Sequence, residues 1–236
     1  MSDIRDDKTY TVRKMADGNC WMSDSLKLEL YDTTSSTNIN PTPIAVEVVN
    51  NNTGEIATTG TNITNGKWTP DGTGGTSNAA TALNGNTAYN SSNGEWHYSW
   101  YAATANSGTE SMTDQDATLS ICPRGWRLPT NYTNTNYPSG GANKSWGYLV
   151  NAYGISPENH TSDMEYKTLG AQPFSLPRVG FFHSGALWGD SGQWWSATAY
   201  STATNAYDLS FYTTYVNPQD SSNGKLYGFN VRCVAI

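Results

Sequence analysis

The sequence predicts a single α+β domain built mainly from short strands, with one helix and long loops. Apolar and polar residues alternate along several short segments, which is the period of a strand. One segment instead repeats its apolar residues at the spacing of a helical face. Much of the remaining sequence of this 236-residue chain is rich in Gly, Asn, Thr and Ser, which favour loops. We therefore expect one domain with a long insertion rather than two separate cores.

The first third of the chain predicts a hairpin followed by the insertion. Residues 9–15 alternate as a strand, and the Asp17-Gly18 pair indicates a turn before residues 20–26, as in a hairpin or a strand-to-turn unit. From Asp32 to Gly94 the chain is rich in Thr, Asn and Gly and has one apolar run, at residues 44–49. This composition predicts an insertion with a short strand or two.

The predicted helix lies in the second half of the chain. Residues 114–121 are compatible with a short helix or a strand. The stronger helical pattern runs from Trp146 to Tyr153, where apolar residues recur at i, i+3, i+4 and i+7. Beyond it, Pro173, Pro177 and several glycines divide the chain into short strands and turns.

Composition and charge exclude several classes of function. The chain is 36% hydrophobic and 14% charged, so its core must depend on nine Trp and fifteen Tyr. A net charge of -7 argues against nucleic acid as a partner, since phosphate contacts need Lys and Arg. No apolar run reaches the roughly 18 residues of a membrane span, so we expect no membrane insertion. The first residues also lack the apolar stretch of a signal peptide, as in an exported protein whose signal has been removed.

Four segments resemble the Fibrobacter major paralogous domain family, which has a C-type lectin-like fold. Only the stretch from Asp32 to Gly94 lies outside the resemblance, and the Arg-Leu-Pro-Thr piece is also similar to the formylglycine-generating enzyme group on the same fold. The four landmarks, in order, are Cys20-Trp-Met-Ser-Asp-Ser-Leu26, Cys122-Pro-Arg-Gly-Trp-Arg-Leu-Pro-Thr130, Trp194-Trp-Ser-Ala-Thr198 and Tyr227-Gly-Phe-Asn-Val-Arg-Cys-Val234.

The resemblance implies one disulfide bond. Three cysteines permit one bridge and leave one thiol, and their spacing fits no zinc site. The family landmarks favour a bond between Cys122 and Cys233, with Cys20 as a buried thiol. The alternative is three reduced cysteines in a cytosolic chain. Arg127 and Arg232, within the same landmarks, are expected to tie loops together rather than to act in catalysis.

The segment from Trp194 to Cys233 also resembles the variable region of proteins diversified by retroelements, in which adenine miscopying changes residues at fixed positions. Its polar residues are rich in Tyr, Ser, Thr, Asn and Asp, as in an antibody paratope. Leu209, Phe211, Phe229 and Val231 are expected to be buried, and Asp208, Ser210 and Tyr212 to be exposed. The predicted ligand-binding residues are Tyr200, Ser201, Thr202, Thr204, Asn205, Asp208, Ser210, Tyr212, Thr213, Thr214, Tyr215, Asn217, Asp220, Ser221, Ser222, Asn223, Lys225 and Tyr227.

The sequence offers little support for catalysis or metal binding. His97, His160 and His183 share no motif with a nucleophile, and the cysteine arrangement of the formylglycine enzymes is absent. Asn217-Pro-Gln-Asp220 and Trp188-Gly-Asp190 are near misses, in the wrong order, to the calcium motifs of C-type lectins. We expect no catalytic residue, metal or cofactor. Most tryptophans are expected in the core, with Trp194 the best candidate for exposure.

The sequence therefore predicts a ligand-binding module, without enzymatic activity, of an exported or cell-surface protein. Its partner is expected to be a protein or a surface polymer, and Tyr200, Tyr212, Tyr215 and Tyr227 are expected to converge on one face. The alternatives are a structural or adhesive surface domain without a diversified site and, third, calcium-dependent carbohydrate binding. A binding protein should show a contiguous group of exposed tyrosines, whereas a structural domain should scatter them.

Overall fold

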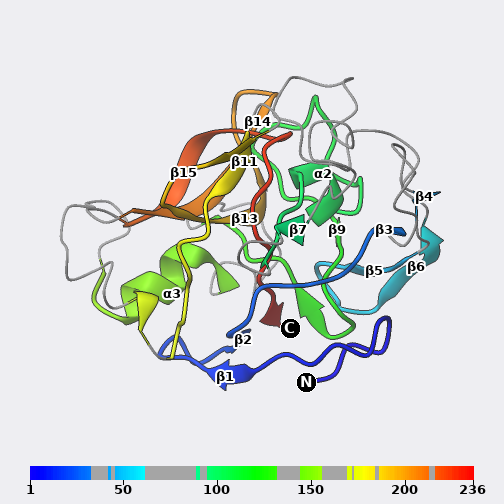
Figure 1. Ribbon diagram of the computed structural model, residues 1–236, viewed down its shortest axis with the longest axis horizontal. Helices are drawn as coiled ribbons and strands as arrows, with labels where there is room; N and C mark the ends of the chain where they lie inside the picture. Colours follow the sequence, from blue (N-terminus) through cyan, green and yellow to red (C-terminus); the bar gives the residue numbers. More distant parts are fainter. Residues whose placement is uncertain are drawn as a thin grey trace.

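A computed structural model of the chain shows a mixed fold of small antiparallel sheets and short helices (Figure 1). It describes residues 1–32, 42–43, 46–61, 89–90, 95–131, 144–155, 169–171, 173–183, 186–212 and 216–236. Trp68, in the predicted insertion, and His160 lie outside the described residues. None of the described helices is long and apolar enough to cross a membrane.

A four-stranded sheet brings the two ends of the chain together. Its order is β1-β2-β16-β10, and Trp21 of β2 pairs with Val234 of β16. Gly18 has a φ of +83°, which suits the turn between the first two strands. The hairpin expected near the N-terminus is confirmed. The four strands are β1 (Val12–Lys14), β2 (Cys20–Met22), β10 (Trp126–Arg127) and β16 (Val234–Ala235).

The longest strands form a three-stranded meander. Strands β13 (Gly192–Ala199), β14 (Asn205–Phe211) and β15 (Val216–Gly224) pair antiparallel in chain order. The β15 strand contains Pro218, which it tolerates because it lies at the edge of the sheet. On the edge of β13 that does not pair with β14, Trp194 forms a parallel bridge with Asn230. The third family landmark therefore lies beside the fourth.

The remaining strands form smaller sheets. In the sheet β6-β5-β9, the first two strands come from the predicted insertion. Val48 and Val49 of β5 are fully buried in the main core, so this part of the insertion belongs to the same core. The strands are β3 (Tyr31–Asp32), β4 (Thr42–Pro43), β5 (Val46–Asn50), β6 (Ile56–Thr61), β7 (Tyr89–Asn90), β8 (Glu95–Trp96), β9 (Leu119–Ser120), β11 (Phe181–His183) and β12 (Ala186–Trp188).

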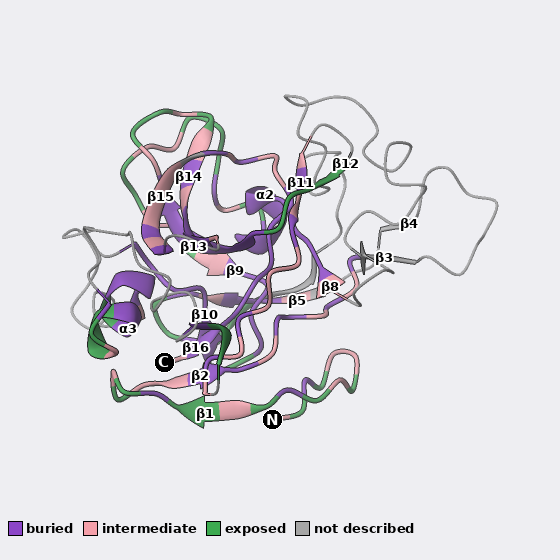
Figure 2. Ribbon diagram, turned by 60° about the vertical axis from the view of Figure 1, so that its left-hand side comes forward, coloured by how far each residue is buried: buried purple, intermediate pink, exposed green. Residues whose placement is uncertain are grey.

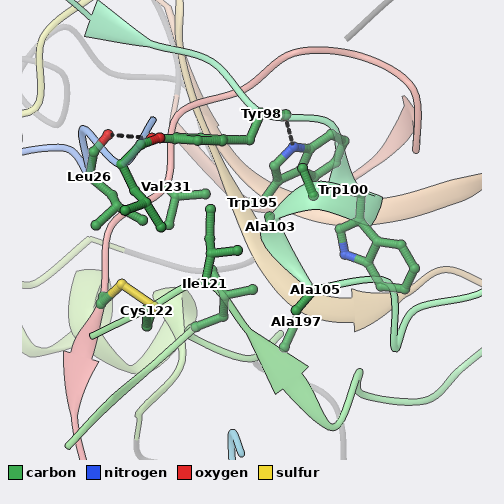
Figure 3. Close-up of a cluster of buried hydrophobic side chains, with 14 of the residues drawn as sticks. Leu26, Tyr98, Trp100, Ala103, Ala105, Ile121, Cys122, Trp195, Ala197 and Val231 are labelled. Atoms are coloured by element: carbon green, nitrogen blue, oxygen red, sulfur yellow. Dashed lines mark hydrogen bonds between the residues drawn. A yellow bond between two sulfur atoms is a disulfide. The ribbon is translucent and has the colours of Figure 1, made fainter. Parts of the chain in front are cut away.

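Two hydrophobic clusters cover opposite faces of the β13–β15 sheet. The larger includes the helix α2 (Trp100–Ala103), and Figure 3 shows part of it around Tyr98 and Trp195. Trp195 stacks on Phe229 with ring centroids 4.1 Å apart, and its Nε1 donates a hydrogen bond to the carbonyl of Tyr98. The smaller cluster joins Trp194, Leu209 and Phe211 to the helix below the sheet in Figure 1.

That lower helix is α3 (Trp146–Ala152), which confirms the predicted helix. The hydroxyl of Ser145 accepts a hydrogen bond from the backbone N–H of Tyr148 and so caps the first turn. Trp146, Leu149 and Val150 are buried on one side of α3, as the periodicity of the sequence predicts.

The expected disulfide is present. Cys122 and Cys233 are bonded with Cα atoms 6.0 Å apart, within the range that such a bond requires, and they are 111 positions apart in sequence. Closing so long a loop stabilises the fold by up to about 4 to 5 kcal/mol in the chain-entropy model. Cys20 is a free, half-buried thiol.

Of the two landmark arginines, Arg232 ties segments together as expected. Arg127 donates a hydrogen bond from Nε to the carbonyl of Leu128. Arg232 is buried and donates to the carbonyls of Phe174 and Ser175 over distances of 2.6 and 3.3 Å. The guanidinium of Arg232 thus holds the loop before β11 against the last segment of the chain.

Candidate functional site

The tip of the β13–β14 hairpin, residues 200–205, is the most exposed part of the predicted binding segment among the residues that the structure describes. The backbone N–H of Tyr200 donates to the carbonyl of Asn205 over 3.1 Å, and that of Asn205 donates to the carbonyl of Thr202 over 2.9 Å. The Thr204 hydroxyl donates to the side-chain oxygen of Asn205 over 3.0 Å. Ser201, Thr202 and Thr204 are exposed, so the hairpin tip presents three hydroxyls on a closed turn.

Tyr200 of the hairpin tip packs against Tyr207 of β14. The rings of Tyr200 and Tyr207 meet edge to face, with centroids 5.1 Å apart and an interplanar angle of 90°. Burial raises the pKa of Tyr207, and Tyr200 and Asp114 raise it further. Tyr207 did not figure among the predicted binding residues, because it alternates with Leu209 and Phe211 on the apolar face of β14. At this end of the sheet that face is no longer fully covered, and Tyr207 is half-buried.

Lys225 supports the hairpin tip from inside the molecule. Its Nζ donates to the carbonyl of Ala203 over 2.6 Å and lies 4.8 Å from the centroid of the Trp100 ring. Burial lowers the pKa of Lys225 to about 8. Lys225 was predicted to bind ligand, but it is buried and connects the hairpin tip to the loop at residues 109–112. Its other acceptors are the carbonyls of Thr109, Glu110 and Met112, at 3.0, 3.3 and 2.8 Å.

The predicted exposure of Asp208 and Ser210 is wrong. Both side chains are fully buried, although Leu209 and Phe211 between and beside them are buried as predicted. Register explains the error, because Asp208 pairs with Trp195, whose side chain lies in the larger hydrophobic cluster. The sheet is therefore covered on both faces, and alternation along β14 separates two cores rather than core from solvent.

The buried polar groups of β14 are only partly satisfied. Asn223, also buried, donates from its side-chain amide to Oδ1 of Asp208 over 2.9 Å. Oδ2 of Asp208 and the hydroxyl of Ser210 have no hydrogen-bond partner among the described residues. Burial raises the pKa of Asp208 well above its ordinary value, and the carboxylate of Asp220 on β15 raises it further.

The three described tyrosines of the predicted face, Tyr200, Tyr212 and Tyr227, do not form one cluster. Tyr200 follows β13 and Tyr212 follows β14, so they lie at opposite ends of an antiparallel hairpin. Tyr212 is half-buried, and its hydroxyl accepts a hydrogen bond from Nε2 of Gln193 over 3.3 Å. Tyr227 packs on Phe181 of β11. Tyr215, with Thr213 and Thr214, lies outside the described residues, as does the side chain of Ser222.

The remaining predicted binding residues lie along β15. Asn217, Asp220 and Ser221 are partly exposed. The carbonyl of Ser221 accepts a hydrogen bond from the side-chain amide of Asn205 over 3.2 Å, which ties β15 to the hairpin tip. The structure therefore brings Ser221 next to the hairpin tip, whereas Asn217 lies at the other end of β15, opposite Ser210.

A second exposed feature is the aromatic surface formed by Phe181, His183, Trp188 and Tyr227. Trp188 is 50% exposed on β12, which Figure 2 shows as exposed. Trp194, expected to be exposed, is instead fully buried against Phe211. The signal that could have identified this surface is the dense run of aromatic residues on either side of a Ser-Gly pair between residues 181 and 188.

No group of three or more His, Cys, Asp or Glu side chains that could hold a metal ion occurs among the described residues. His97 is buried, and burial lowers its pKa to about 4. His183 lies on the aromatic surface.

Comparison with known proteins returns no relative. No protein-family model, curated protein or solved structure matches this chain.

Proposed function

We propose that this chain is a ligand-binding module that uses the hairpin tip as its principal contact surface. The observation that carries the proposal is the composition of the hairpin tip, where three exposed hydroxyl residues lie next to the half-buried rings of Tyr200 and Tyr207. The buried Lys225 supports this surface from inside the molecule. Tyrosine gives a large contact area at a low cost in entropy, and serine and threonine supply adaptable hydrogen bonds. A protein or a surface polymer is the proposed partner.

The proposed fold family is the C-type lectin-like Fibrobacter major paralogous domain. The support for it is the meeting of the four landmarks around the last segment of the chain. The first and second landmarks pair with β16, and the third lies beside Asn230. The disulfide between Cys122 and Cys233 supports a location in an oxidising compartment, at the cell surface or outside the cell.

A substitution experiment tests the hairpin tip. The tip variant replaces Tyr200, Thr202 and Thr204 with alanine, and the control variant replaces the exposed Arg13 and Lys14 of β1, on the opposite side of the molecule in Figure 1. Binding is measured by biolayer interferometry on immobilised extracellular proteins and polysaccharides. A ligand of the wild type should bind the tip variant at least about tenfold more weakly and the control variant unchanged.

The melting temperature provides the second measurement. Surface substitutions usually cost less than about 0.5 kcal/mol each, so both variants should melt within a few degrees of the wild type. A ligand that binds the tip variant as tightly as the wild type would refute the proposed contact surface. Unfolding of the tip variant would favour a structural role for these residues.

We further propose that this surface is diversified by a retroelement, because the segment is rich in Tyr, Ser, Thr, Asn and Asp. The neighbouring DNA tests this origin. A near-identical copy of the codons from Trp194 to Cys233, differing chiefly at adenines and lying beside a reverse transcriptase gene, is the expected finding. The differences should fall at exposed positions such as Thr202 and spare the buried Asp208 and Ser210. Without such a copy, the module has a fixed binding surface.

A further inference from the structure

One tryptophan differs from the others that the structure describes. Of the nine in the chain, Trp68 lies outside the described residues, seven are buried, and Trp188 is 50% exposed. Exposing an indole forgoes the gain from its burial. The indole of Trp188 is nevertheless held in place, because its Nε1 donates a hydrogen bond to the carbonyl of His183 over 2.8 Å.

The aromatic surface around Trp188 is preorganised by ring stacking. The centroid of His183 lies 5.6 Å from that of Trp188 and 4.3 Å from that of Tyr227, with interplanar angles of 55° and 53°. Phe181 stacks on Tyr227 and meets Phe229 edge to face. Since Phe229 also stacks on the buried Trp195, the aromatic surface is anchored in the core.

The hairpin register places these side chains on one face. Phe181 pairs with Trp188 and His183 pairs with Ala186, so the side chains of Phe181, His183 and Trp188 point to the same side of the hairpin. Leu187 and Phe182 point to the other side, where Phe182 packs against His97. Leu187 is 43% exposed and therefore offers an apolar control on the same strand but on the other face.

The electrostatics of this surface favour a cation. The face of an aromatic ring carries partial negative charge and attracts cations, and tryptophan is the strongest of the aromatic residues in this respect. The whole chain has a net charge of -7, which attracts cations and repels anions at long range.

We propose that the aromatic surface binds a quaternary ammonium group, as found in choline or trimethyl-lysine, on the exposed face of Trp188. Such a group is large, weakly hydrated and positively charged, so that it combines apolar contact with attraction to the ring. This site is separate from the hairpin tip and does not depend on the function proposed for it.

An isosteric pair of probes tests the charge. Choline and 3,3-dimethylbutan-1-ol have nearly the same shape, but only choline is charged. Each is titrated into the ¹⁵N-labelled protein, and the Trp188 indole signal is followed by NMR. Choline should bind with an affinity about two- to fivefold higher than the neutral alcohol, as expected for a cation on an exposed ring. Equal affinities would show a merely apolar surface and overturn the proposal.

Variants test the location. Trp188→Leu keeps apolar bulk but removes the ring, and it should abolish the choline response, whereas Leu187→Ala should retain it. A second variant, Trp188→Phe, keeps a ring and should bind with intermediate affinity. Choline binding that survives Trp188→Leu would overturn the proposal. A trimethyl-lysine peptide is titrated in parallel, and the tighter of the two cations identifies the source of the group.

Discussion

The tip and the middle of the β13–β14 hairpin have similar polar side chains in opposite surroundings. At the tip, Ser201, Thr202 and Thr204 are exposed, and two backbone hydrogen bonds close the turn. In the middle, Asp208 and Ser210 lie between two hydrophobic clusters, and each has one polar atom without a partner among the described residues. Polar side chains at the tip can therefore contact a ligand, whereas the buried polar side chains in the middle lower the stability of the fold.

The largest expected effect sharpens this contrast. Phe211→Ala in the buried part of β14 removes a ring that stacks on Trp194, with centroids 5.4 Å apart. It should lower the free energy of unfolding by about 3 to 5 kcal/mol. Thr202→Ala at the tip should change it by less than about 0.5 kcal/mol. Urea denaturation measures both, and similar costs for the two variants would end the distinction between tip and middle.

The disulfide tests whether the two regions share one framework. Replacing Cys122 and Cys233 with alanine should lower the free energy of unfolding by about 2 to 5 kcal/mol, because the unfolded chain loses its cross-link. Cys20→Ala is the matched control and should cost far less, since this thiol is unbonded. Equal losses from the double variant and from Cys20→Ala would contradict a structural role for the bond.

A buried histidine gives the interior a dependence on pH that the tip lacks. The pKa of His97 is lowered to about 4 by burial, so between that pH and the ordinary value of 6.5 the unfolded chain binds more protons. The stability linked to His97 is thus complete above pH 6.5 and is lost as the pH falls toward 4. The loss amounts to about 3 kcal/mol.

Urea denaturation of the wild type and of His97→Gln at pH 7.5 and 4.5 isolates this contribution. Glutamine can donate the hydrogen bond that His97 Nε2 makes to the carbonyl of Gly180, but it does not titrate. The wild type should lose more stability than the variant over this range. A parallel loss in both proteins would assign the pH dependence to other groups.

The smallest expected effect concerns the carboxyl group of Asp208. Its pKa is raised by burial, so the folded state binds a proton that the unfolded state releases, and the associated stability is lost as the pH rises above about 4. Asp208→Asn keeps an oxygen for Asn223 and removes the charge. The variant should be more stable than the wild type at pH 7, with the gain shrinking toward pH 4. A destabilised variant at pH 7 would indicate that the charge itself is required.

The sequence predicts the parts of this fold that depend on local pattern. Alternation identifies Leu209, Phe211, Phe229 and Val231 as buried, and the helical spacing identifies α3. Each of these follows from residues whose neighbours in sequence carry the same signal. The disulfide, in contrast, joins residues 111 positions apart and was expected only from the resemblance of the landmarks to a known family.

Long-range packing explains what the sequence does not predict. Asp208 and Ser210 are buried because the segments around Tyr98 and Phe229 cover a second face of the sheet, and no local pattern in β14 records that cover. Lys225 is internal because its acceptors come from a loop more than a hundred positions away in sequence. Trp188 is exposed because its hairpin lies on the outside of an aromatic stack, which depends on Tyr227 from the end of the chain.

The long covalent loop between Cys122 and Cys233 has a consequence for proteolysis. It encloses the whole β13–β15 sheet, including the exposed hairpin tip, where a protease has the readiest access. A single cut between residues 201 and 204 would divide the backbone but leave both pieces joined through sulfur. The nicked protein would migrate as one species on a non-reducing gel and as two after reduction. A damaged contact surface would thus remain attached to the rest of the domain instead of being shed.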